Sequence, residues 1–319
     1  MPLTAYYFMG QDLCMVRRHV REDMSWMADA GTDSVAIGIH EFQLDYGKQQ
    51  QMDILFEEAG RAGLGVHAIP SRWAGLVAGW PPAAGMFAAT HPDSWMMKAD
   101  GSPLFSTAGG GPVCSIYDPA TNEFFRDAID RLLALYPVQG VIWDEIKVLQ
   151  WEDHSSHAVR ALGGPAGGDA HLERAVDFFG RASRHARERK PDLVISAFVY
   201  AFLPDATLRA CAGIEALDFF GIDGKCYPGD GPTAKTLLGN FERVVAACGD
   251  KSVGTLALIE TQKLPASRQA ATVEHLPGFL TRPVDHLLYY YHGACAEDGE
   301  ACMRAMKPLL RDWRSRRGR

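Results

Sequence analysis

The stretch Gly140–Lys147 (GVIWDEIK) joins a strand-like apolar run to three charged side chains. The run ends at the adjacent carboxylates Asp144 and Glu145, and Lys147 follows two residues later. Ionised side chains at the tip of a buried strand need water, a partner or a substrate. Carboxyl groups in such a place can transfer a proton or attack an electrophilic carbon. A later apolar run ends in the same way, at Glu260. These tips predict the floor of an active site.

The order of elements along the chain predicts how these tips are positioned. Apolar residues at helical spacing predict helices between successive strands, and continuous apolar strands are typical of parallel sheets that helices cover on both faces. The predicted helices include Phe124–Tyr136, Leu172–Lys190, Ala234–Cys248, Ala266–Leu280 and Gly299–Arg314. The predicted strands are Ala5–Met9, Ser34–His40, Gly65–Pro70, the run that starts at Gly140, Leu193–Tyr200, Asp218–Gly224, Ser252–Glu260 and His286–Gly293.

Eight such repeats in 319 residues are the signature of a (β/α)8 TIM barrel. We expect residues 1–319 to form a single catalytic domain of this α/β class. A long insertion, rich in Gly, Pro and Trp, runs from Ser71 to about Asn122, between the third strand and the third helix. The competing fold is a doubly wound open sheet. It is disfavoured because no GxGxxG follows the first strand and no P-loop lysine motif occurs.

In a barrel of this kind the reactive residues lie at the carboxyl ends of the strands. Nearly every predicted strand turns polar there, whereas the amino ends share no comparable set. The candidate residues at these ends are His40, Glu41, Arg72, Trp73, Asp144, Glu145, Tyr200, Asp223, Lys225, Glu260, Tyr291 and His292.

Glu145 and Glu260 are the candidate catalytic pair. Cleavage of a glycosidic bond with retention needs two carboxyl groups about 5 Å apart, and strands four and seven lie on opposing sides of a narrow barrel. The placement resembles the clan A glycoside hydrolases, which carry the acid/base after strand four and the nucleophile after strand seven. The resemblance implies that Glu145 is the acid/base and Glu260 the nucleophile of a retaining hydrolase. It rests on the architecture and these two glutamates, and Asp144 stands where that clan has Asn.

Three other functions stay open. A second glycosidase clan, acting on α-linked sugars, has an aspartate nucleophile after strand four and an aspartate acid after strand six, where this chain has Asp144 and Asp223. Lys225 follows strand six, where class I aldolases carry the lysine that forms a Schiff base with the substrate. A non-catalytic carbohydrate-binding barrel would keep the aromatic residues and hold the two glutamates far apart or in salt bridges.

The remaining candidates are expected to bind substrate. Tryptophans around a polar cleft suit sugar rings, and Trp73 lies in the insertion. Arg72 can clamp a substrate carboxylate or sulfate, or pair with Glu41 or Asp144. His40 and Tyr200 are further candidates for contacts with sugar hydroxyls. Tyr291 and His292 can form such contacts from strand eight.

Composition limits the partners. The net charge of −7 argues against nucleic acid, whose phosphates require a basic face. There is no signal-peptide pattern and no apolar run near the ~20 residues of a membrane helix. The seven cysteines lack CxxC spacing, so free thiols in the cytoplasm are expected. The cluster that contains His154 and His157 matches no metal-ligand motif. We therefore expect a carbohydrate partner and no metal or cofactor, and leave the oligomeric state open.

Overall fold

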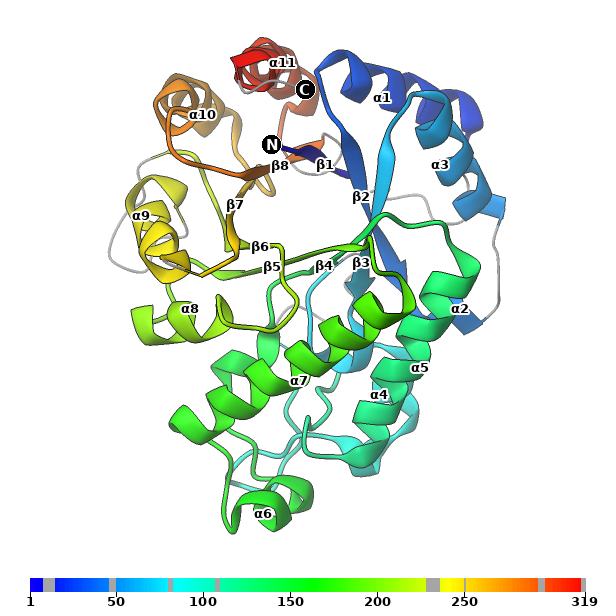
Figure 1. Cartoon of the computed structure of the whole chain (residues 1–319), viewed down its shortest axis with the longest axis vertical. Coiled ribbons are helices and arrows are strands. Elements are labelled where there is room, and N and C mark those ends of the chain that lie inside the picture. The colour runs from blue at the N-terminus through cyan, green and yellow to red at the C-terminus, as the bar shows by residue number, and fades with distance from the viewer. Residues whose placement is uncertain are drawn as a thin grey trace.

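The computed structural model describes residues 1–7, 15–45, 50–79, 83–106, 110–227, 236–249, 251–291 and 296–316. Eight parallel strands form a closed barrel in which each strand pairs with the next one in sequence and β8 pairs with β1. Figure 1 shows this ring from one side. The strands are β1 (Leu3–Tyr7), β2 (Ser34–His40), β3 (Gly65–Ser71), β4 (Gly140–Trp143), β5 (Val194–Tyr200), β6 (Phe219–Gly224), β7 (Gly254–Ile259) and β8 (His286–Tyr291).

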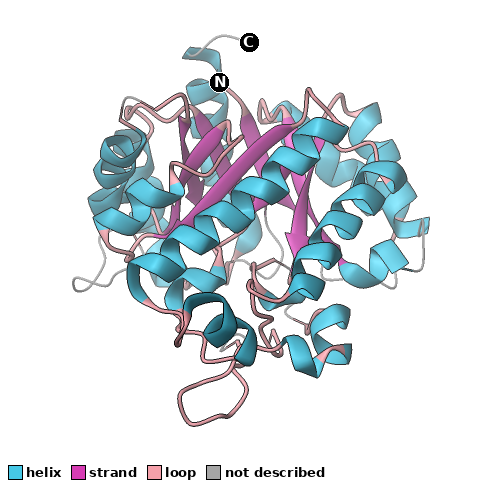
Figure 2. Ribbon diagram, turned by 60° about the horizontal axis from the view of Figure 1, so that its bottom comes forward, coloured by secondary structure: helices cyan, strands magenta, loops and turns pink. Residues whose placement is uncertain are grey.

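Helices form a layer outside the strands, as Figure 2 shows. This arrangement confirms the predicted (β/α)8 barrel. Within the described residues, none of the helices is both long and apolar enough to cross a membrane. The helices are α1 (Arg17–Asp29), α2 (Glu41–Asp45), α3 (Gln50–Arg61), α4 (Met86–Thr90), α5 (Pro119–Leu135), α6 (Ser156–Leu162), α7 (Gly168–Arg189), α8 (Asp205–Cys211), α9 (Leu237–Cys248), α10 (Ala266–Phe279) and α11 (Gly299–Arg316).

The insertion after β3 has little regular structure. Between Ser71 and α5 it contains α4 and two short 3-10 helices, η1 (Trp73–Gly75) and η2 (Pro92–Ser94). Isolated bridges such as Trp95 with Cys114 hold its arms together. The insertion therefore starts at a strand end of the barrel, and these bridges join parts of it that the structure describes.

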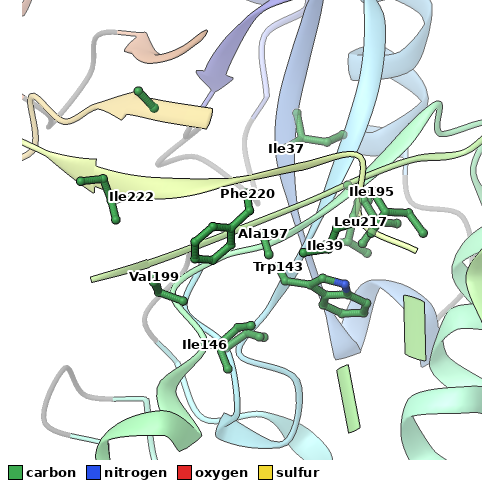
Figure 3. Close-up of a cluster of buried hydrophobic side chains, with 14 of the residues drawn as sticks. Ile37, Ile39, Trp143, Ile146, Ile195, Ala197, Val199, Leu217, Phe220 and Ile222 are labelled. Carbon is green, nitrogen blue, oxygen red and sulfur yellow. The ribbon is translucent and has the colours of Figure 1, made fainter. Parts of the chain in front are cut away.

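The main core lies between the strands and the surrounding helices. Figure 3 shows part of it, with Trp143, Phe220 and Ile195 among the buried side chains. Trp143 is fully buried and its indole N–H donates to Ser183 Oγ on α7, 2.9 Å away. Trp143 therefore faces the helices, and the residues on either side of it face the interior of the barrel.

A second, smaller core fills the inside of the barrel. It consists of Tyr6, Ala36, Ile69, Ile142, Phe198, Leu256, Leu258, Leu288 and Tyr290. Successive side chains of a strand point to opposite faces. The residue two positions after each of these residues therefore also faces the interior of the barrel.

The amino ends of the strands carry a buried polar layer. Thr4 Oγ1 lies 2.7 Å from Ser34 Oγ and 2.8 Å from His286 Nε2. The ring of His67 meets that of His286 edge-on, with centroids 6.1 Å apart. Burial lowers the pKa of His67 to about 4 and holds the pKa of His286 well below its ordinary value. The amino ends therefore carry a neutral polar layer that the sequence did not reveal, because these residues are spread one per strand among apolar neighbours.

Candidate active site

Alternation along the strands brings the strand-four and strand-seven carboxyl groups to the mouth of the barrel. Ile142 lies in the interior cluster, and Asp144 continues the same face two residues later. Leu258 lies in the same cluster, and Glu260 follows it by two residues. Both carboxylates are buried, Asp144 at 5% and Glu260 at 6% exposure. The two tips therefore end inside one mouth.

A sharp bend follows β4 at Glu145. Its φ of 39° lies in the left-handed region, which costs a non-glycine residue of order 1–3 kcal/mol and is concentrated at functional sites. The insertion holds this bend in place. The N–H of Ala78 donates to the carbonyl of Asp144 at 2.7 Å, and the N–H of Lys147 donates to the carbonyl of Leu76 at 2.8 Å.

Lys147 links the tips of β4 and β5. Its Nζ lies 2.6 Å from Oε2 of Glu145, and it also donates to the hydroxyl of Tyr200. The lysine side chain is only 6% exposed, so little water screens the pair. A cation this close stabilises the ionised form of the glutamate.

Asp144 lies beside this pair in a different electrostatic state. Burial first, and then the negative charge of Glu145, raise its pKa from 3.8 to about 7. The charge of Lys147 and a hydrogen bond with Tyr6 act in the opposite direction but do not offset these effects. Burial and the neighbouring charge therefore favour the protonated form of this carboxyl group far more than water does.

The opposite side of the mouth carries Glu260, Asp223 and Lys225. Glu260 continues the pairing of β6 and β7, since its N–H donates to the carbonyl of Gly224 at 2.9 Å. Its Oε1 lies 3.5 Å from Nζ of Lys225, which also donates to the carbonyl of Gln262. Asp223 is 2% exposed and pairs with Tyr200 across β5 and β6.

Tyr290 and Tyr6 line the floor of the mouth and were missed by sequence reasoning. Their ring centroids lie 5.3 Å apart inside the barrel. The pKa of Tyr290 is raised first by burial and then by four carboxylates, those of Asp144, Glu260, Asp223 and Glu145. The four carboxyl groups thus act on a single phenol. The two-residue spacing from Leu288 is the signal that would have identified Tyr290.

Two predicted substrate-binding residues lie outside the mouth. Tyr291 points to the outer layer, where its hydroxyl donates to Asp23 of α1 at 2.9 Å. Trp73 is fully buried, and its indole N–H donates to the carbonyl of Ile39 at 2.9 Å. Tyr291 is one residue out of register with the interior face, and Trp73 turns into the core after the strand ends. His292 lies outside the described residues.

His40 is the last residue of β2 and Glu41 follows it, and the two side chains have different surroundings. The carboxylate of Glu41 accepts the N–H groups of Ala74 at 2.9 Å and Phe87 at 2.5 Å. Burial raises the pKa of Glu41 to about 7. Glu41 therefore anchors the insertion rather than pairing with Arg72. Burial chiefly lowers the pKa of His40, and the charge of Arg72 lowers it further.

No group of three or more His, Cys, Asp or Glu side chains that could hold a metal occurs among the described residues. The cluster after β4 makes other contacts. His154 Nε2 lies 3.2 Å from Oε2 of Glu152, and Asp153 accepts the hydroxyl of Ser115 at 2.6 Å. The described side chains at the mouth include carboxyl groups, phenols and cations.

No protein-family model matches this chain, and no curated protein matches its sequence. Several solved structures match its fold. An endo-1,4-β-mannanase from Rhizomucor miehei matches with a TM-score of 0.64 over 99% of this chain and 94% of its own, at 11% identity. The catalytic domain of a β-amylase from Paenibacillus polymyxa matches with a TM-score of 0.65 over 98% of each chain, at 9% identity.

An α-L-fucosidase isoenzyme 2 from Paenibacillus thiaminolyticus also matches, with a TM-score of 0.65 over 98% of this chain at 11% identity. This chain spans 49% of the length of that fucosidase. Identities this low show likeness of fold alone. The chain thus has the eight-stranded parallel barrel on which these three glycoside hydrolases are built.

Proposed function

We propose that this protein is a glycoside hydrolase that works with paired carboxyl groups. One observation carries the proposal: Asp144, Glu145, Asp223 and Glu260 lie at the carboxyl ends of β4, β6 and β7, and the charges of all four act on Tyr290. One of the four, Asp144, holds its proton near neutral pH. Glycosidic cleavage needs one protonated and one ionised carboxyl group on either side of the bond. The fold neighbours are compatible with this proposal.

We assign the general acid to Asp144 rather than to Glu145. The resemblance to clan A implied Glu145 for this role, but Lys147 at 2.6 Å favours the ionised form of Glu145. Asp144 would donate its proton to the leaving oxygen as the bond to the anomeric carbon breaks. Glu260 would attack that carbon or direct a water onto it. The charges of both carboxyl groups act on Tyr290.

The assignments with other residues remain distinguishable by mutation. Asp144 and Asp223 together match the clan that acts on α-linked sugars, with Asp144 as nucleophile. The aldolase alternative is weaker, because a Schiff-base lysine must lose its proton before it attacks. Glu260 at 3.5 Å and the carbonyl of Gln262 both favour the protonated amine of Lys225.

A second candidate function is a non-catalytic carbohydrate-binding barrel. Two ion pairs favour it, since Glu145 with Lys147 and Glu260 with Lys225 tie up both glutamates. The raised pKa of Asp144 favours catalysis instead, because strongly perturbed carboxyl groups cluster at active sites.

A panel of aryl glycosides and unactivated disaccharides in both anomeric forms tests the proposal. We expect turnover of at least one member, with product stereochemistry that assigns retention or inversion by NMR. The variant Glu260→Gln should lower kcat by about 10²–10⁴-fold. Calorimetric binding of a sugar without any turnover would overturn the hydrolase and support the binding barrel.

A further inference from the structure

Three cationic side chains, Lys147, Lys225 and Arg72, lie at the mouth, and their partners differ. Nζ of Lys147 lies 2.6 Å from a carboxylate oxygen of Glu145, and Nζ of Lys225 lies 3.5 Å from one of Glu260. The guanidinium of Arg72 has no carboxylate within ion-pair distance in the part of the chain that the structure describes. Arg72 is nevertheless only 7% exposed.

The backbone of Arg72 is tightly fixed. Its φ of 59° is left-handed, its N–H donates to the carbonyl of Ala78 at 2.8 Å, and its carbonyl accepts the N–H of Gly75 at 3.0 Å. The side chain is also anchored, because Nε donates to the carbonyl of Gly79 at 3.1 Å. The guanidinium group is thus fixed through Nε, and its two terminal nitrogens, Nη1 and Nη2, form the fork at the end of the side chain.

The backbone ties Arg72 to the tip of β4, since Ala78 accepts the N–H of Arg72 and donates its own N–H to the carbonyl of Asp144. The charge of Arg72 contributes to lowering the pKa values of both Asp144 and His40. Nη1 also lies near Gly110, where an added Cβ would come within 3.0 Å of it. A side chain at position 110 would therefore crowd the end of the fork, whereas glycine leaves it accessible.

A buried charge is costly unless another charge compensates it. Protonation of Asp144 removes a negative charge that interacts with Arg72, whereas Lys147 and Lys225 keep a glutamate each. Arg72 is then the cation that gains most from an anion brought by a ligand. Because Nε already donates to the carbonyl of Gly79, Nη1 and Nη2 are the nitrogens of Arg72 that would donate to the ligand.

We propose that the substrate sugar carries an anionic group, a carboxylate or a sulfate ester, which binds to Arg72. This inference rests on the proposed hydrolase site and names its substrate class. A guanidinium fork matches the paired oxygens of either group and gives charge-assisted hydrogen bonds of the stronger kind. Uronic acids and sulfated sugars are the two sources of such an anion.

Nitrophenyl glycosides in both anomeric forms test the proposal, with glucuronides, 6-sulfated glucosides and neutral glucosides compared. We expect the wild-type enzyme to favour one anionic series in kcat/KM by about 10–100-fold, as one or two charge-assisted hydrogen bonds allow. The series that is favoured identifies the anion. In Arg72→Gln the ratio of anionic to neutral kcat/KM should fall toward one, and Arg72→Lys should recover part of it because the charge remains without the fork.

Arg18→Gln is the matched control, since this arginine side chain is 74% exposed on α1, and it should keep the wild-type ratio. The melting temperature of each variant checks its folding. A wild-type preference for neutral glycosides, or an unchanged ratio in Arg72→Gln, would overturn the inference.

Calorimetry with free glucuronate and glucose 6-sulfate separates this inference from the hydrolase itself. Anion binding that Arg72→Gln weakens about 10-fold or more, without turnover of any glycoside, would refute the hydrolase and support the anion site. Turnover of glycosides together with anion binding that is absent or unaffected by Arg72→Gln would support the hydrolase and refute the anion site.

Discussion

The two ends of the barrel interior both bury polar groups but differ in charge. At the amino end Thr4, Ser34 and His286 form a neutral chain of hydrogen bonds of 2.7 and 2.8 Å. At the carboxyl end, carboxylates and cations meet, and Asp144 keeps a proton that it would lose in water. Burial at the amino end lowers the pKa values of His67 and His286, so these histidines add no positive charge to the interior at physiological pH. Buried polarity alone therefore does not mark the site; the gathering of charges does.

The largest expected difference between the two ends is in catalysis. Asp144→Asn removes the proposed acid and should lower kcat/KM for unactivated glycosides by about 10²–10⁴-fold. Activated aryl glycosides, whose leaving groups need no proton, should be much less affected. Glu145→Gln is the comparison variant, because the resemblance to clan A placed the acid there. A larger and more leaving-group-dependent loss in Glu145→Gln would return the acid role to Glu145.

The two ends should also respond to pH with opposite signs. The folded protein holds the proton of Asp144 up to about pH 7, whereas the unfolded chain loses it near 3.8, so this group lowers stability as pH rises from about 4 to 7. The folded protein keeps His67 neutral down to about pH 4, whereas the unfolded chain binds a proton near 6.5. This group therefore lowers stability as pH falls from about 6.5 to 4.

Urea unfolding between pH 4 and 8 separates these two contributions. Relative to the wild type, Asp144→Asn should gain stability as pH rises, because the penalty of the buried carboxylate is gone. His67→Gln should gain relative stability as pH falls. Parallel curves for the wild type and either variant would contradict the corresponding pKa shift.

A smaller effect is expected from the hydrogen bonds at the amino end. Thr4→Val keeps the shape of the side chain but leaves Ser34 and His286 without their shared partner. Leaving such buried groups unsatisfied should lower the free energy of unfolding by about 1–3 kcal/mol, measured by urea denaturation. The kcat should not change. A fall in kcat at unchanged stability would mean that this end also serves the reaction.

The smallest effect distinguishes two adjacent tyrosines. Tyr291→Phe removes the hydrogen bond to Asp23 and should cost about 0.5–1.5 kcal/mol of stability with no change in kcat/KM. Tyr290→Phe changes a phenol among the four carboxyl groups and should lower kcat/KM or shift its pH profile. Equal kinetic effects of the two substitutions would refute the assignment of Tyr290 to the mouth.

The barrel could be predicted because apolar residues recur with a different spacing in strands and in helices. Ser34–His40 was predicted with the bounds that β2 has, and the other strands were found within a few residues. Helix α8 was not identified, because Asp205–Cys211 is two turns long and has only two buried residues. The insertion could be located by its length, but its path depends on tertiary contacts such as those of Glu41 with Ala74 and Phe87.

The candidate site was partly predictable for a different reason. The predicted strand ends indicated where in the barrel a residue would lie, and this identified Asp144, Glu145, Asp223 and Glu260 as candidates. The direction in which a side chain points, into the barrel or toward the helices, was harder to predict. Three consecutive tyrosines at 289–291 show no alternation of polarity, so the sequence alone does not reveal which of them faces inward. The spacing of Glu145 and Lys147 already allowed an ion pair between them, but the sequence did not indicate that Asp144 would be the better candidate for the acid.

The dependence of kcat/KM on pH tests the central claim most directly. For an unactivated glycoside, activity should fall as pH rises through about 7, where Asp144 loses its proton, and this descending limb should be absent in the residual activity of Asp144→Asn. An activated aryl glycoside should show little or none of the limb. A wild-type profile without the limb, or the same limb in Asp144→Asn, would contradict the proposal that Asp144 is the acid of this site.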